Sequence, residues 1–91
     1  MTNRKDLKRT INYICSELFA ECVAASLYGG GNQDKQNTEA LLTSILRINS
    51  DFVMRISHPE PGMPKKKYFQ ILIHDFNEQV SEIIDQINNN L

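Results

Sequence analysis

Apolar residues recur at alternating steps of three and four along two long stretches of this chain, and this rhythm constrains the fold more than any other feature. Such spacing places side chains on one face of an α-helix, because a helix completes a turn every ~3.6 residues. The later stripe consists of Phe69, Ile73, Phe76, Val80, Ile83 and Ile87. The earlier stripe consists of Leu7, Ile11, Ile14, Leu18, Cys22 and Ala25. The strict apolar–polar alternation typical of strands is absent from the sequence, which therefore predicts an all-α protein.

Two segments rich in glycine or proline separate the helical stretches. Gly29–Gly31 should end the first helix, because glycine adopts the left-handed conformation common at helix C-termini. The prolines between His58 and Pro64 break the next helix, since proline lacks an amide hydrogen. We therefore expect helices over about residues 4–28, 38–57 and 65–88 in a single domain of 91 residues. Short connections between long helices predict an up-down-up antiparallel three-helix bundle.

The expected middle helix contains one weak point. Its apolar stripe consists of Leu41, Leu42, Ile45, Ile48, Phe52 and Ile56. Asn49–Asp51 interrupts that stripe with three residues that favour caps and turns. The segment is either one continuous helix, as the uninterrupted apolar phase favours, or two short helices that meet near Asn49.

Parts of the first and third helices carry more apolar side chains than one helix face can hold. A lone three-helix bundle covers only one side of each helix. The surplus therefore indicates either a first helix that is central and covered further by loops, or a partner, which would be a second copy or another protein. The candidate partner-binding residues are Phe19, Val23, Leu27, Tyr28, Ile71 and Leu72. From this surplus we expect a small, non-enzymatic helical interaction protein.

The expected topology gathers positive charge at one end of the bundle, where the first and third helices start and the second ends. Eight of the ten basic residues fall there: Arg4, Lys5, Lys8, Arg9, Arg55, Lys65, Lys66 and Lys67. Asp6 and Glu60 offset two of them and leave +6, while the rest of the chain carries −7. Cations at helix N-termini oppose the macrodipole. Either water and salt screen these charges in a solvated cap, or an anion bound between the two starts relieves the repulsion. An alternative function is therefore nucleic-acid or phospho-ligand binding through Arg4, Lys5, Lys8, Arg9, Lys65, Lys66 and Lys67.

No catalytic, cofactor or metal motif emerges from the sequence. Cys15 and Cys22 are seven residues apart, about 10 Å along one helix, which is too far for a disulfide between them. They match no metal-ligand spacing with His58 or His74, and no base accompanies them as it would a nucleophile. The sequence predicts no metal, no cofactor and no enzymatic activity.

The first part of the chain also carries a resemblance. Arg4–Phe19, together with Glu21–Ala24, is similar to small uncharacterised all-helical proteins of Gram-negative anaerobic bacteria. The resemblance implies a helical fold in a bacterial cytoplasm and supplies no activity or functional residues. A cytoplasmic location also fits the start of the chain, which does not have the pattern of a signal peptide, and the absence of any apolar run of ~18–20 residues.

Overall fold

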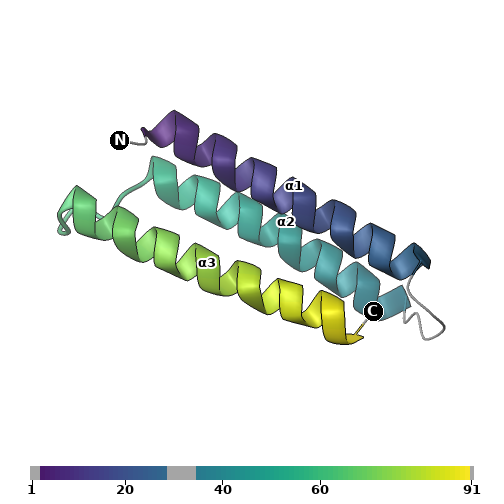
Figure 1. Cartoon of the computed structure of the whole chain (residues 1–91). Helices are drawn as coiled ribbons and strands as arrows, with labels where there is room; N and C mark the ends of the chain where they lie inside the picture. Colours follow the sequence, from purple (N-terminus) through teal and green to yellow (C-terminus); the bar gives the residue numbers. More distant parts are fainter. Residues whose placement is uncertain (1–2, 29–34, 91) are drawn as a thin grey trace.

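The computed structural model describes residues 3–28 and 35–90, except for the side chain of residue 90. This part of the chain contains three α-helices. Helix α1 spans Arg4–Tyr28, α2 spans Lys35–Ser57 and α3 spans Lys65–Asn90. The helices run up, down and up, so α1 and α3 are parallel and start at the same end (Figure 1). The predicted bundle is confirmed, although α2 starts three residues earlier and α3 ends two residues later than expected. The predicted glycine terminator, Gly29–Gly31, lies outside the described residues.

Local hydrogen bonds explain where α1 and α3 begin. The Asn3 side chain caps α1, because its Oδ1 accepts a hydrogen bond from the Asp6 amide at 2.8 Å. The Leu7 amide donates to the Asn3 carbonyl at 3.0 Å and closes the first turn. At α3, the Tyr68 amide donates to the Pro64 carbonyl at 3.0 Å, so Pro64 immediately precedes the helix. Its fixed φ suits that position, and its missing amide hydrogen leaves no donor unpaired.

Helix α2 passes through Asn49–Asp51 without a break. Phe52 and Ile56 are buried at 3% and 0% exposure, so the apolar face continues past the polar residues. Ser50 and Asp51 point to solvent, where their side chains do not compete with core packing. Asn49 is half-buried, and among the described residues its Oδ1 is buried without a hydrogen-bond partner. Of the two alternatives in the sequence, the continuous helix is therefore correct.

The core runs along the whole bundle between the three helices. Its buried residues are Ile11, Cys15, Leu18, Cys22, Leu41, Ile45, Phe52, Ile56, Leu72, Phe76, Ile83 and Ile87. Phe52 of α2 and Phe76 of α3 pack edge to face, with ring centroids 5.2 Å apart. α1 packs most extensively against α2 and least against α3. The seam between α1 and α3 is consequently the loosest of the three.

The rotation of α3 about its axis near its start differs from the prediction. Leu72, which we expected on a partner-binding surface, is fully buried at 0% exposure. Ile73, which we expected in the core stripe, is 43% exposed. Leu72 lies one turn before Phe76 and almost in line with Ile83, so it lies on the buried face of α3. Ile73 is rotated from Leu72 by about 100° around the helix axis, which places it at the edge of the buried face.

Candidate interaction surfaces

The six apolar residues predicted to bind a partner do not form one surface. Leu27 and Tyr28 are 64% and 85% exposed in the last turn of α1. Ile71 is 39% exposed near the start of α3, which lies at the opposite end of the bundle (Figure 1). Phe19 and Val23 are half-buried, and Leu72 is removed from the set because it belongs to the core.

A more continuous apolar surface lies between α1 and α3. We call it the α1–α3 groove; its volume is about 320 Å³, and Glu17, Glu21 and Asn88 lie at its rim. Tyr13 and Ile84 flank it with 65% and 43% exposure. Its apolar lining consists of Tyr13, Ile14, Leu18, Val80, Ile84 and Ile87. The groove exists because α1 and α3 make the least contact of any helix pair.

Sequence reasoning missed this groove. The available signal was the pair Ile83–Ile84, because adjacent isoleucines on a helix are about 100° apart and cannot both occupy the centre of one narrow stripe. Ile83 is buried at 5% exposure, whereas Ile84 lines the groove. Tyr13 could not be assigned in advance, since its position depends on which side of α1 receives α3.

The groove between α1 and α2 is larger but more polar. It encloses about 400 Å³ and contains Phe19, one of the predicted partner-binding residues, beside Leu46. Leu46 is 59% exposed. The polar side chains of Asn12, Ser16 and Asn49 share this lining. An apolar partner would therefore have to cover several polar groups here, which is unfavourable unless it supplies hydrogen bonds to them.

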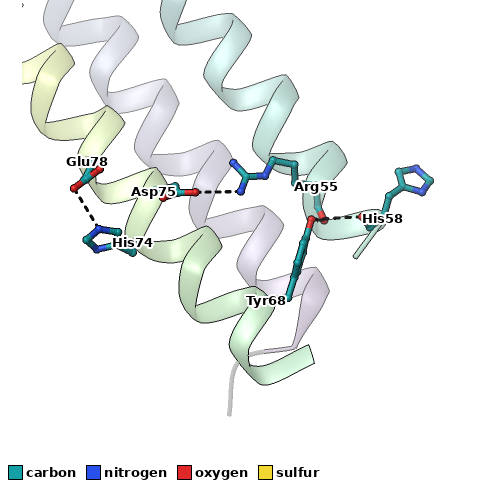
Figure 2. Close-up of polar contacts among 6 residues, drawn as sticks. All are labelled: Arg55, His58, Tyr68, His74, Asp75 and Glu78. Atoms are coloured by element: carbon teal, nitrogen blue, oxygen red, sulfur yellow. Dashed lines mark hydrogen bonds and ion pairs between the residues drawn. The ribbon is translucent and has the colours of Figure 1, made fainter. Parts of the chain in front are cut away.

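Polar contacts tie α2 to α3. The Arg55 guanidinium lies 3.3 Å from Asp75 Oδ2 and 4.7 Å from the centroid of the Phe52 ring. The Tyr68 hydroxyl donates to the Arg55 carbonyl at 3.0 Å, and the His58 carbonyl lies 3.4 Å away (Figure 2). Arg55 lies in the last turn of α2, where backbone acceptors lack partners within the helix, and His58 is the first residue after it. We call the two contacts, Arg55–Asp75 and Tyr68 to these two carbonyls, the α2–α3 latch.

The cations at the shared start of α1 and α3 form the basic pole, composed of Arg4, Lys5, Lys8, Arg9, Lys65, Lys66 and Lys67. All are exposed except the half-buried Lys8. Within residues 3–28 and 35–90, none of them forms an ion pair. Arg55 lies at the same end, but it pairs with Asp75 in the latch. The positive charge that remains open to a ligand therefore comes from α1 and α3.

The two cysteines and the two histidines were also considered in the sequence as possible nucleophiles or metal ligands. Cys15 and Cys22 are free and buried, and burial raises the pKa of both thiols, which keeps them protonated and poorly nucleophilic at neutral pH. His74 Nε2 lies 3.2 Å from Glu78 Oε1, one turn along α3, and both side chains are exposed (Figure 2). Across the described ranges, no three or more histidine, cysteine or acidic side chains converge as metal ligands would.

Neither the helices nor the similarity searches assign a class of protein to this chain. None of the three described helices combines the length and apolar character that crossing a bilayer requires. Searches against protein families, curated proteins and solved structures found no match for the chain.

Proposed function

We propose that this chain is a small non-enzymatic interaction protein of the cytoplasm whose α1–α3 groove receives apolar side chains of a protein partner. One observation carries the proposal: Tyr13 and Ile84 remain 65% and 43% exposed on the two sides of an apolar groove. Burying large aromatic and aliphatic side chains is the main source of affinity in protein interfaces. The acidic rim, Glu17 and Glu21, would orient the partner.

The other two long faces are less suited to this role. The groove between α1 and α2 includes Asn12, Ser16 and Asn49, whose polar groups would lose water on docking. The face between α2 and α3 is lined by charged side chains, among them Arg47, Asp51 and Glu78. These considerations support the α1–α3 groove as the partner site.

A photo-crosslinking experiment tests the proposal. Benzoylphenylalanine replaces Tyr13, an aromatic residue of similar shape, in the chain expressed in its own cells. The matched control carries the same group at Met54, which is 60% exposed on α2. Met54 lines neither the α1–α3 groove, nor the groove between α1 and α2, nor the charged face between α2 and α3. We expect a discrete crosslinked species from position 13 and none from position 54. Equal crosslinking at both positions, or none at either, would contradict the proposal.

The basic pole supports a second candidate, the nucleic-acid or phospho-ligand binding considered above. The parallel course of α1 and α3 brings Arg4 and Lys65 to one end, with two helix N-termini that attract anions (Figure 1). Binding would weaken steeply as salt rises. The test is a gel shift at low salt with duplex and single-stranded probes, using wild type and a variant in which Lys65–Lys67 are replaced by glutamine. Absence of retardation, or retardation that the variant retains in full, would rule out this candidate.

A further inference from the structure

We propose that the occupant of the α1–α3 groove is a second copy of this chain, packed antiparallel to the first. The inference rests on the proposed function and deepens it by naming the partner. Three observations support it: a self-complementary row of side chains on α1, the charge distribution along the bundle, and the area of the long face.

The row on α1 consists of residues spaced four apart. Arg9, Tyr13, Glu17 and Glu21 follow one another along the same ridge of the helix, and all four are exposed. The last three line the α1–α3 groove. When a second α1 lies antiparallel over the first, centred between Tyr13 and Glu17, Arg9 of each copy faces Glu21 of the other. In a parallel pair, Arg9 would face Arg9 and Glu21 would face Glu21. The row therefore complements itself in one orientation only.

The charges of the whole molecule are distributed in the same direction as those of the α1 row, with basic residues at one end and acidic residues toward the other. The basic pole occupies the end where α1 and α3 start, and the acids of the later half of α3, Glu82 and Asp85, lie toward the opposite end (Figure 1). Antiparallel packing brings the basic pole of one copy toward the acidic end of the other. Parallel packing would bring two basic poles together, which repel at short range. Charge thus selects the antiparallel arrangement, while the groove contributes the apolar contact.

The dimensions of the bundle fit a stable dimer. The molecule measures 49 × 20 × 17 Å, so the outline of its narrower long face, 49 × 17 Å, is about 830 Å². An interface of standard size buries about 800 Å² of accessible surface on each partner, so a dimer of this kind would use nearly a whole long face. The radius of gyration of 14.9 Å exceeds the ~12 Å typical of a compact domain of this length. An elongated shape of this kind offers a long face for side-by-side packing.

The symmetry specifies which elements meet. A two-fold axis that lies in the interface and perpendicular to the helices places α1 against α1 and α3 against α3. With the α1 row paired as above, the exposed flank of Ile84 falls near Val80 of the partner copy. The interface then consists of an apolar strip along α3 and a mixed strip along α1, where the Arg9–Glu21 pairs fix the register.

Sedimentation velocity on the full chain tests the proposal, with protein concentrations up to about 100 µM, above the weakest affinities that standard-size interfaces show. Wild type is expected to sediment as a dimer of 10.4 kDa chains. Ile84→Glu should raise the dimer dissociation constant by at least ~30-fold, because it buries a charge at the centre of the apolar strip. The matched control, Met54→Glu, should leave the constant unchanged. Both positions are exposed, so both variants should keep the helical circular dichroism of wild type, which is measured as the control for folding.

Charge exchange tests the orientation. Arg9→Glu alone and Glu21→Arg alone should each raise the dissociation constant by ~5–10-fold, whereas the double variant should return to within ~3-fold of wild type. A strictly monomeric wild type, an Ile84→Glu variant that dimerises as well as wild type, or a double variant weaker than either single variant would overturn the inference. If wild type is monomeric yet Tyr13 crosslinks to a different protein in cells, self-association fails and the proposed docking function survives. If the crosslink is also missing, both fail.

Discussion

The rotation of α3 makes a sharp prediction about two neighbouring residues. Leu72 is 0% exposed and its side chain contributes to the centre of the bundle, whereas Ile71 is 39% exposed. Truncating a fully buried leucine to alanine removes apolar contacts and leaves a cavity, at a cost of about 2–5 kcal/mol. Truncating Ile71 leaves no enclosed cavity, and the higher helix propensity of alanine offsets part of the loss, so the cost should stay below about 1 kcal/mol.

These costs are large compared with the stability of so small a domain. At roughly 0.05–0.15 kcal/mol per residue, a chain of 91 residues has a free energy of unfolding of about 5–14 kcal/mol. Leu72→Ala therefore removes a substantial part of it and should lower the Tm by at least ~8 °C, given ~4–8 °C per kcal/mol for a domain of this size. The volume-conserving variant Leu72→Met should cost less than about 1.5 kcal/mol.

The assay is urea unfolding followed by circular dichroism at one protein concentration, because self-association would make stability depend on concentration. The midpoint should fall steeply for Leu72→Ala and only slightly for Ile71→Ala, with the same dependence on urea for all variants. Equal destabilisation by the two alanine variants, or greater destabilisation by Ile71→Ala, would refute the rotation of α3 described above.

Four further predictions concern Tyr68, Asn49 and the two buried cysteines. Tyr68→Phe removes the hydroxyl that donates to a carbonyl at the end of α2 and should cost about 1 kcal/mol, measured as a lower Tm; an unchanged Tm would show that the latch adds no stability. Asn49→Leu removes a buried oxygen that has no partner among the described residues and should raise the unfolding free energy by about 1 kcal/mol in urea; a loss would mean that this oxygen is satisfied in solution. Cys15 and Cys22 should resist a thiol reagent in the native protein and react fully in urea, so fast native labelling would contradict their burial. Burial raises the pKa of both thiols in the folded state above the pKa of about 8.5 that a thiol has in the unfolded chain. The thiols should therefore contribute their full stability below a pH of about 8.5, and the free energy of unfolding should decline as the pH rises above that value. A Cys15→Ala/Cys22→Ala variant should lack this decline.

The sequence predicted the architecture because the relevant signals are local. The step pattern through Ile11, Leu18 and Cys22 identified the buried face of α1 correctly. Proline between His58 and Pro64 identified the end of α2 and the start of α3. Such features depend on residues within one or two turns of each other, so they can be read without knowing the tertiary structure.

The candidate site was harder to predict because it depends on how the helices are rotated against one another. Ile71, Leu72 and Ile73 are consecutive apolar residues, and only packing against α1 and α2 decides which one is buried. The α1–α3 groove is lined by both Tyr13 and Ile84, which are far apart in the chain and share this groove only because α3 lies beside α1. Hydrophobic periodicity shows which face of a helix is apolar, but not how closely each pair of helices packs. The closeness of packing determines between which two helices a groove opens.

The odd number of helices has a mechanical consequence. Residues 3 and 90 lie at opposite extremities of the rod, since α1 and α3 point the same way (Figure 1). Tension applied between these two positions would act along the helix axes and would load the interhelical contacts in shear, so that many side chains resist at once. A bundle with an even number of antiparallel helices would instead have both attachment points on one side, where the same pull would separate its outer helices one contact at a time.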